Sequence, residues 1–254
     1  MLAQERRNLI LEQLQQDKSV VVAELSKHYD VSEETIRRDL DRLEKDGFAI
    51  KSYGGAVINE SVSIDMPFNI RKKNNTAGKR KIGELAAHLV NNGDHVILDA
   101  SSTAVFIAKA LKSKKNLTII TNSIEIMIEL ADMPDWHIIA PAGSLKMGYL
   151  ALVGPRVVES IQQYNVEKAF ISCKGIHLAN GVTDTNEDFA QAKHVMLRQA
   201  KEKILAVDSS KFGRIAFARI AETDGVDIIV TDVKPQQDWL DYFAEHDMKC
   251  YYPE

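Results

Sequence analysis

Hydroxyl and amide side chains follow three short apolar runs in the C-terminal part of the chain. The first two groups are Asp99, Ser101, Ser102 and Thr103, and Thr121, Asn122 and Ser123. A third group, Ala142–Ser144, follows the next run. Backbone N–H groups and the positive dipole end at a helix N-terminus bind phosphate. Helix capping explains one such loop on its own, whereas three on one sheet edge indicate a site for an anion or a polyol.

Three lysines are placed to complete that site. Lys174 follows the fourth apolar run, Lys211 follows the fifth, and Lys193 lies on the helical segment between them. An ammonium group is a compact positive charge that can neutralise a phosphate. Lys211, at a strand end, is the best placed of the three, because a loop lysine such as Lys174 is more commonly solvated.

Acidic residues near the same strand ends are compatible with binding or with catalysis. Asp99, Asp184 and Asp188 could accept hydrogen bonds from sugar hydroxyls, although Asp99, like Asp208, could instead cap the turn that follows it. A sugar-phosphate isomerase or transferase needs a carboxylate beside the reacting carbon as a general base. Asp184 and Asp188 are separated by three residues, and Phe189 follows Asp188 in place of a second acid. Binding without turnover is favoured, with no catalytic residue, metal ion or cofactor assigned, and an enzyme is the alternative.

A different chemistry is indicated near the N-terminus. Ser32 can cap a helix that Gly47 ends. Ile36, Leu40 and Leu43 are spaced by four and three residues, so they form the buried side of that helix. Its first turn and outer side, together with the segment after Gly47, supply six candidate DNA-binding residues: Glu34, Thr35, Arg37, Arg38, Lys51 and Tyr53.

The position of these six residues decides their interpretation. In a helix-turn-helix the N-terminal end of the recognition helix enters the major groove, where arginine pairs with guanine and threonine contacts a thymine methyl or a phosphate. Lys51 and Tyr53 would hold the sugar-phosphate backbone. For an isolated Arg37–Arg38 pair, a solvated charged helix would be the better interpretation. The preceding turn and the following hairpin favour DNA recognition.

The elements that position these residues form two domains of different class. Amphipathic helices are predicted over 2–16, 23–29 and 32–46, with an extended piece at 19–22 and a two-stranded wing over 48–57 around Gly54 and Gly55. Beyond Lys79, strands alternate with helices; the predicted strands are 95–99, 117–121, 136–140, 168–173, 203–208 and 227–231. The fold is therefore an N-terminal all-α winged helix-turn-helix plus a C-terminal α/β domain with a mainly parallel sheet. The expected boundaries are 1–58, a linker at 59–78, and 79–254.

Composition excludes several classes of protein. The 254 residues are 45% hydrophobic and 27% charged, which is ordinary for a globular protein with a core. No apolar run approaches the length of a membrane span, and the polar start of the chain does not resemble a signal peptide. Cys173 and Cys250 are far apart, lack metal-ligand neighbours and are expected to be buried, inert thiols. A cytoplasmic protein is expected.

The charge of the N-terminal domain bears on assembly. Residues 1–58 hold nine Lys or Arg and eleven Asp or Glu, a net charge of −2. Because non-specific DNA affinity depends on the phosphates neutralised, one such domain should bind weakly, and a homodimer or homotetramer on a palindromic site is expected. The segment 69–81 has six basic and no acidic residues. It is equally well interpreted as a DNA-backbone contact or as a solvated linker.

Several motifs together resemble one protein family. The segment 31–40 (VSEETIRRDL), followed by LEKDG at 43–47 and YGGA at 53–56, closely resembles the DeoR family of bacterial regulators. The resemblance continues through LDASST at 98–103, TNS at 121–123, VGP at 153–155, AFI at 169–171, DSSKFG at 208–213 and TD at 231–232. It implies a repressor of a sugar-catabolism operon. The implied C-terminal domain is similar to ribose-5-phosphate isomerase and acyl-CoA transferases and binds a phosphorylated sugar, which releases the repressor from its operator.

The resemblance also assigns Lys193 to the effector site, and two departures from it affect the expected ligand. Many relatives have glycine and a second threonine in the first loop, where this chain has Ser101 and Ala104, and many have glutamate where this chain has Phe189. The first loop and the segment 172–176 look similar to the fucose- and rhamnose-operon branch, whose inducers are deoxyketose phosphates. An aromatic wall would suit a methyl group on such a ligand.

Overall fold

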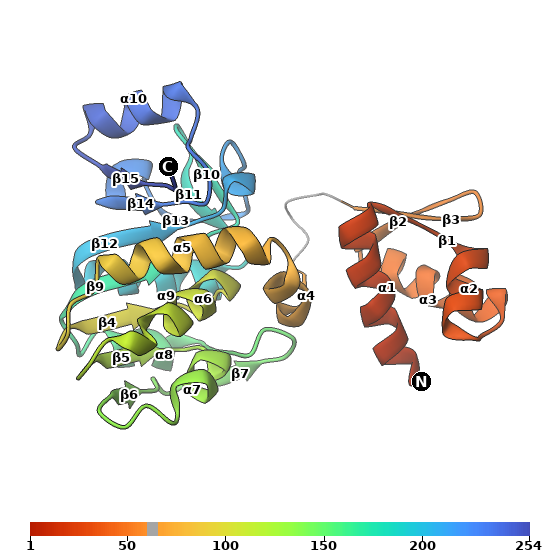
Figure 1. Ribbon diagram of the computed structural model, residues 1–254, viewed down its shortest axis with the longest axis horizontal. Helices are drawn as coiled ribbons and strands as arrows, with labels where there is room; N and C mark the ends of the chain where they lie inside the picture. The colour runs from red at the N-terminus through yellow and green to blue at the C-terminus, as the bar shows by residue number, and fades with distance from the viewer. Residues whose placement is uncertain (60–65) are drawn as a thin grey trace. The chain divides into compact units, whose positions relative to one another are not determined.

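The chain forms two compact units. The computed structural model describes residues 1–59 and 66–254, which divide into Met1–Asn74 and Asn75–Glu254 (Figure 1). The segment expected as a linker, 59–78, is shared between them. Residues 60–65 lie outside the described part, helix α4 (Phe68–Lys73) belongs to the N-terminal unit, and helix α5 (Thr76–His88) begins the C-terminal unit.

The N-terminal unit has the predicted winged helix-turn-helix order with one additional strand pairing. Its elements are α1 (Ala3–Asp17), β1 (Ser19–Val21), α2 (Val22–Tyr29), α3 (Glu33–Lys45), β2 (Ala49–Ser52), β3 (Gly55–Ile58) and α4. The wing hairpin β2–β3 is joined by β1, which pairs antiparallel with β3, so the sheet order is β1-β3-β2. A Cβ on Gly55 would collide with the Val20 carbonyl oxygen, so this close pairing requires glycine.

Local sequence explains the limits and the buried side of α3. The Ser32 hydroxyl accepts a hydrogen bond from the Thr35 amide at 3.2 Å, and Gly47 has a φ of 82° just after the helix. Ile36, Leu40 and Leu43 are buried against side chains of α1 and α2. Burial of each such side chain contributes about 1.5–3 kcal/mol. The predicted cap, end and apolar stripe of this helix are confirmed.

The C-terminal unit contains one large sheet and two small ones. Its helices are α5, α6 (Ser102–Ala110), α7 (Ile124–Leu130), α8 (Pro155–Ile161), α9 (Glu187–Arg198) and α10 (Gln237–Glu245). The large sheet has seven strands: β4 (His95–Leu98), β5 (Thr118–Thr121), β6 (His137–Ile139), β9 (Val166–Ile171), β12 (Ala200–Ala206), β14 (Ile228–Val230) and β15 (Lys249–Tyr251). The small sheets are β7 (Ser144–Lys146) with β8 (Ala151–Val153), and β10 (Gly175–His177) with β11 (Gly181–Asp184) and β13 (Ala218–Ala221).

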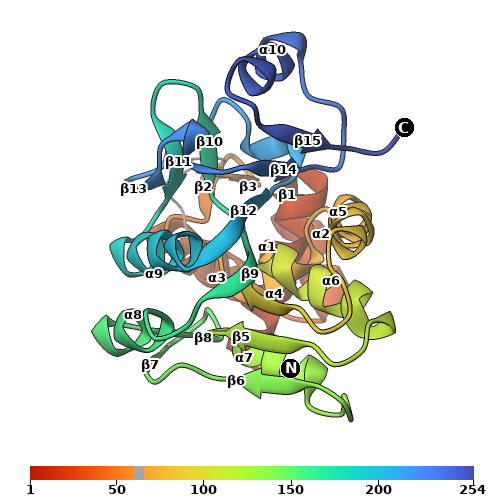
Figure 2. The same cartoon turned by 90° about the vertical axis from the view of Figure 1, so that its left-hand side faces the viewer.

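Strand order reverses its direction across the large sheet at β4. The order is β15-β14-β12-β9-β4-β5-β6, and every neighbouring pair is parallel. From β4 the chain proceeds through β5 and β6 in one direction, then returns to β9 on the other side of β4. Helices α5 and α6 cover one face, and α8 and α9 cover the other (Figure 2). Ligands bind at the carboxyl ends of strands at such a reversal.

One predicted loop has a different role. The segment Ala142–Ser144 was expected to contribute, with the first two polar loops, to a site for an anion or a polyol. It leads instead into the hairpin β7–β8, and Ser144 is exposed. A Cβ on Gly143 would approach the Val157 side chain of α8 and the Val153 carbonyl oxygen. The loop therefore packs the hairpin against α8 and supplies no helix N-terminus for an anion.

Candidate functional site

The outer face of α3 presents the two arginines assigned to DNA. The Arg37 side chain is 53% exposed and the Arg38 side chain 77% exposed. Arg37 contacts Glu33 at 2.6 Å and Arg38 contacts Glu34 at 3.2 Å, each one turn earlier in the same helix. Exposed pairs of this spacing contribute about 0.3–0.5 kcal/mol, so either guanidinium can exchange its glutamate for a DNA base or phosphate at little cost.

The wing is attached to the same helix. The Lys51 amide donates to a Glu44 carboxylate oxygen at 2.9 Å, and the Lys51 ammonium group contacts Asp41 at 2.5 Å. The hydrogen bond and charge of Asp41 raise the pKa of Lys51. Tyr53 is fully exposed at the hairpin turn, beside Gly54 with a φ of 81°. The predicted DNA-contacting residues of helix and wing therefore belong to one connected unit, with Thr35 held at the first turn by Ser32.

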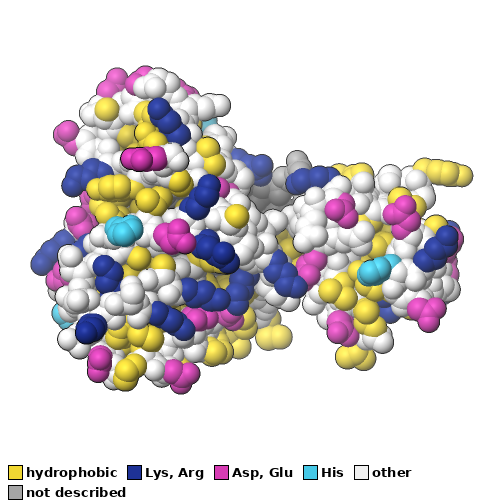
Figure 3. Space-filling view, viewed as in Figure 1, with side chains coloured by type: hydrophobic (Ala, Val, Ile, Leu, Met, Phe, Trp, Pro, Cys, Tyr) yellow, Lys and Arg dark blue, Asp and Glu magenta, His cyan; other side chains and the backbone are white. Residues whose placement is uncertain are grey.

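Sequence reasoning missed the ion pair that fixes α3 in place. Asp39 faces inward from α3, is buried, and accepts a hydrogen bond from the Arg6 guanidinium at 2.5 Å. Arg7 contacts its other carboxylate oxygen at 3.5 Å. The signal in the sequence was an acid among the apolar positions of α3 and two adjacent arginines in α1. Acidic and basic side chains are interspersed on the visible face of this unit (Figure 3).

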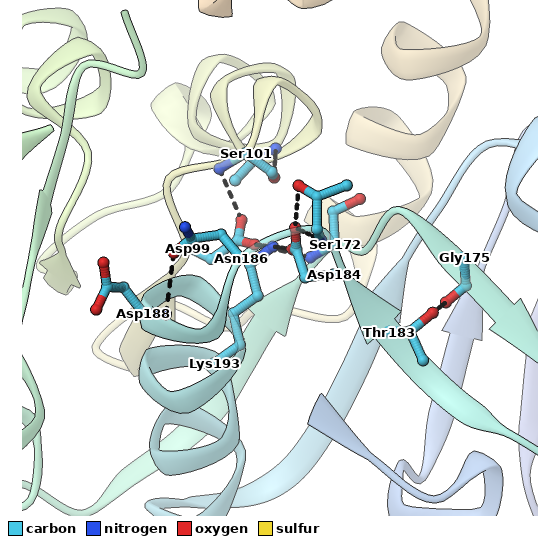
Figure 4. Close-up of polar contacts among 11 residues, drawn as sticks. Asp99, Ser101, Ser172, Gly175, Thr183, Asp184, Asn186, Asp188 and Lys193 are labelled. Atoms are coloured by element: carbon cyan, nitrogen blue, oxygen red, sulfur yellow. Dashed lines mark hydrogen bonds and ion pairs between the residues drawn. The ribbon is translucent and has the colours of Figure 1, made fainter. Parts of the chain in front are cut away.

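At the carboxyl edge of the large sheet, Asp99 organises the loop after β4. One of its carboxylate oxygens accepts the Ser101 amide at 3.1 Å, and the other accepts the Ser172 amide at 2.9 Å, which connects the ends of β4 and β9 (Figure 4). Ser101 Oγ caps α6 by accepting from the Ala104 amide at 3.0 Å. Asp99 and Ser101 therefore shape the loop, while the buried Ser102 and Thr103 stand in the first turn of α6.

Lys193 lies between two carboxylates. Its ammonium group contacts Asp184 at 2.5 Å and Asp99 at 3.4 Å, and all three side chains are buried (Figure 4). Burial by itself would lower the pKa of Lys193, but Asp184 and Asp99 outweigh that effect and raise it. The predicted Lys193 and Asp99 are thus brought together, with Asp184 as their common partner. One ammonium between two carboxylates carries a local charge of about −1, so this cluster alone repels a phosphate.

The loop after β5 leaves a buried acceptor without a partner. Asn122 Nδ2 donates to the Leu152 carbonyl oxygen of β8 at 2.9 Å, which fixes the orientation of the amide. Its Oδ1 is buried and has no hydrogen-bond partner in the described part of the chain. Thr121 and Ser123 hydroxyls cap the local turn and α7, at 3.1 Å and 3.3 Å from the amides they accept. Of the three predicted residues in this loop, Asn122 is the one with a buried side-chain oxygen that accepts no hydrogen bond from the described residues.

Lys211 follows β12 in the 3-10 turn Ser209–Lys211. Burial alone would raise the pKa of Asp208, but the charge of Lys211 and hydrogen bonds from Ser210 lower it. Burial raises the pKa of the Cys173 thiol to about 12, and that thiol also lies within electrostatic range of both Lys193 and Lys211. The turn that carries Lys211 follows β12, and Ser172, which binds Asp99, follows the neighbouring strand β9, so both lie at the same edge of the large sheet. Lys174 is partly buried, and its amide donates to the Thr183 carbonyl at 2.9 Å.

An apolar cluster borders this polar edge. It consists of Ala100, Ala151, Val153 and Phe189, with the Tyr149 ring 5.2 Å from the Phe189 ring between centroids. The Lys146 ammonium group lies 5.7 Å from the Phe189 centroid and 3.3 Å from Asp188. Phe189 therefore forms an aromatic wall beside the loop after β4, and Asp188 is occupied by a lysine of the hairpin.

Comparisons with known proteins decide the family. A family model described as the DeoR-like helix-turn-helix domain matches residues 6–62, and one described as the DeoR C terminal sensor domain matches residues 74–233. The chain belongs to the DeoR family. It is 40% identical over 91% of its length to the uncharacterized HTH-type transcriptional regulator YulB of Bacillus subtilis, covering 90% of that protein. It is 28% identical to the glycerol-3-phosphate regulon repressor of Escherichia coli, over 95% of this chain and 96% of that one.

The predicted family and fold class of this DeoR-family regulator are confirmed. Among solved structures, ribose 5-phosphate isomerase A of Methanocaldococcus jannaschii shares 18% identity with it over 53% of each chain, with a TM-score of 0.38, a likeness that concerns the fold alone. No helix in residues 1–59 or 66–254 is long and apolar enough to cross a membrane.

Proposed function

We propose that this DeoR-family protein represses a sugar-catabolism operon in the cytoplasm and leaves its operator when a phosphorylated sugar binds the C-terminal unit. The observation that carries the proposal is the presence, in one chain, of a winged helix-turn-helix with exposed arginines on α3 and a DeoR sensor domain with a polar sheet edge. A related protein is named a glycerol-3-phosphate regulon repressor, so a phosphorylated metabolite is a reasonable class of effector.

The phosphate is assigned to the first turn of α6 and to Lys211. Ser102 and Thr103 supply hydroxyls and backbone N–H groups there, and the helix dipole favours an anion. Lys193 is assigned a different role from the one expected, because its charge is already compensated by Asp99 and Asp184. It holds the loop after β4 in place rather than pairing with phosphate.

The sugar is assigned to the space between Asn122 and the aromatic wall. Asn122 Oδ1 is a buried acceptor that a sugar hydroxyl would satisfy; leaving such a group unpaired costs about 1–3 kcal/mol. Phe189 and Tyr149 offer an apolar surface to a carbon without a hydroxyl. These features support a deoxyketose phosphate as the effector.

Binding without turnover is part of the proposal. Asp99 and Asp184 are engaged with backbone amides and Lys193, so neither is held ready to remove a proton from a substrate carbon. Incubation of the protein with phosphosugars, followed by analysis for isomerised product, tests this point. Detectable conversion would favour the isomerase-like alternative.

The decisive experiment measures operator release. Lys211→Ala removes a phosphate charge partner and Ser102→Ala removes a hydroxyl, while both leave α3 unchanged. Each variant should occupy the operator normally but require at least tenfold more phosphosugar for release. Lys201→Ala is the matched control, because Lys201 is exposed near the opposite end of β12.

The same titration tests the phosphate itself. The phosphorylated sugar should release the protein and the free sugar should not. If the free sugar released the protein equally well, the phosphate assignment would be wrong and the winged helix-turn-helix would be unaffected.

A further inference from the structure

Two adjacent asparagines end one unit and begin the other. Asn74 Nδ2 donates to Gln15 Oε1 of α1 at 3.1 Å, within the N-terminal unit. Asn75 Nδ2 donates to Asp232 Oδ2 at 2.9 Å, within the C-terminal unit. The peptide bond between them is therefore the point at which the chain passes from contacts with one unit to contacts with the other.

Asn75 holds an unusual backbone conformation at this point. Its φ of 47° and ψ of 48° lie in the left-handed region, which asparagine tolerates better than most residues. Its side-chain Oδ1 caps α5 by accepting the Gly78 amide at 3.2 Å. A Cβ on Gly78 would collide with Asp232 Oδ2, so the close approach of α5 to Asp232 depends on glycine. The direction in which the chain enters α5 is thus fixed by side-chain contacts of Asn75.

Asp232 connects this junction to the turn that carries Lys211. Its second oxygen, Oδ1, accepts the Ser209 amide at 2.7 Å. Ser209 lies in the turn that Asp208 caps, where the Ser210 amide donates to Asp208 Oδ1 at 3.0 Å and the Lys211 amide donates to the Asp208 carbonyl at 3.0 Å. Asp232 is 6% exposed and Asp208 5% exposed, so water does not readily replace these contacts.

We propose that the Asn75–Asp232–Ser209 link fixes the backbone of Asn75 while the protein binds its operator, and that effector phosphate at Lys211 releases it. This inference rests on the proposed function. A phosphate dianion that binds Lys211 displaces the turn Ser209–Lys211, and this movement withdraws the Ser209 amide from Asp232. Without the Ser209 amide on its Oδ1, the Asp232 carboxylate rotates away from Asn75 Nδ2, and the Asn75 backbone is free to leave the left-handed region. The chain direction between Asn74 and α5 changes, and the affinity for the operator falls.

The test replaces the Asn75 Nδ2 donor to Asp232 and keeps the Asn75 Oδ1 acceptor that caps α5. Asn75→Asp still caps Gly78 and still tolerates a positive φ, but it sets a carboxylate against Asp232. The double variant Asn75→Asp with Asp232→Asn exchanges donor and acceptor, since the amide at 232 can accept from Ser209 and donate to the new carboxylate. Asn92→Asp is the charge control, because Asn92 Oδ1 accepts the exposed Lys115 amide at 2.8 Å and aspartate preserves that bond.

The measurements use a duplex selected from random-sequence DNA by the wild-type protein. The probes are glycerol 3-phosphate, fructose 1-phosphate, glucose 6-phosphate and fuculose 1-phosphate, with inorganic phosphate as control. Without any probe, Asn75→Asp should bind the duplex at least fivefold more weakly than wild type, and the double variant should recover wild-type affinity. The probe that releases wild type should bind Asn75→Asp as tightly or more tightly, because coupling is reciprocal.

The possible failures are distinct. If Asn75→Asp and Asn92→Asp bound the duplex with equal affinity and were released alike, the link would have no regulatory role. If Asn75→Asp were weakened but the donor–acceptor exchange did not restore affinity, the effect would come from the junction rather than from the Asp232 contact, which also overturns the inference. If no probe released wild type, the proposed phosphosugar response would fail, while the affinities without probe would still decide the link.

Discussion

The buried ion pair between α1 and α3 gives the most quantitative prediction. Asp39→Asn keeps the size of the side chain but removes its negative charge, so the buried Arg6 guanidinium faces a neutral amide. The Arg6 and Asp39 side chains are 8% and 4% exposed, and the contact is 2.5 Å long. Water cannot readily take the place of the lost charge at this depth. The geometry of α3 against α1 depends on the pair, and so does the position of the DNA-reading face.

The expected loss is large compared with the stability of the unit. Removing one member of a buried ion pair costs about 3–5 kcal/mol. A unit of 74 residues has a total stability of about 4–11 kcal/mol at typical values per residue. The ratio of folded to unfolded N-terminal unit should fall by about two to four orders of magnitude. Operator binding should be weakened or abolished at 37 °C, with phosphosugar binding retained.

Urea unfolding can separate the two units. Both tryptophans, Trp136 and Trp239, lie in the C-terminal unit, so tryptophan emission reports that unit, while far-ultraviolet circular dichroism reports both. Asp39→Asn should move an early dichroism transition to lower urea and leave the emission transition in place. Asp46→Asn is the control, because its partner Arg42 is exposed and 3.1 Å away. Equal, small shifts for both variants would refute the assigned role of the Arg6–Asp39 pair.

Three further predictions concern DNA, assembly and pH. Arg38→Ala, and to a lesser degree Arg37→Ala, should cost about 1–3 kcal/mol of operator affinity if the side chain pairs with a base. Phosphosugar binding should be unchanged in both variants. Normal operator binding by both would place the recognition surface elsewhere. Because residues 1–58 are net negative, sedimentation should give a dimer or tetramer, and a monomer that binds a single half-site tightly would exclude this. The His95 amide, by donating to Glu167, is the main cause that lowers the pKa of Glu167 from 4.5 to about 2, against the opposing effect of burial. The stability that the ionised Glu167 contributes is complete above its unfolded pKa and is lost as the pH falls from about 4.5 through about 2. In Glu167→Gln, the urea midpoint followed by tryptophan emission should therefore depend less on pH in the acid range. An unchanged dependence on pH would contradict the role given to Glu167.

Local signals explain why much of the fold could be predicted. Helix α3 was predictable because its cap Ser32, its apolar period and its end at Gly47 lie within one short segment. Six of the seven strands in the large sheet were predictable as short β-rich runs, since strands covered on both faces need little polar alternation. The edge strand β15 was missed because only Cys250 is partly buried in it.

Contacts between distant residues explain what was missed. The compensation of Lys193 by Asp184 and Asp99 depends on the approach of α9, β11 and β4, which no local pattern encodes. Similarly, Ala142–Ser144 has the composition of a helix-capping loop. The chain continues instead as β7, which pairs antiparallel with β8 and sets Leu145 opposite Leu152. The placement of α4 with the N-terminal unit depends on contacts with α1 across a large sequence separation, including Lys73 with Glu12 at 2.7 Å.

The position of the unit boundary has a consequence for exchanging parts between regulators. Because α4 packs with the N-terminal unit and Asn75 caps the first helix of the other, the natural point for a gene fusion is the Asn74–Asn75 bond rather than the segment after the wing. A chimera joined there would keep the core of each parent intact, including Ile70 on one side and Gly78 on the other. Recombination at this bond would let a lineage acquire a new operator without changing its metabolite, and the same junction would suit a reporter that couples this sugar response to a chosen promoter.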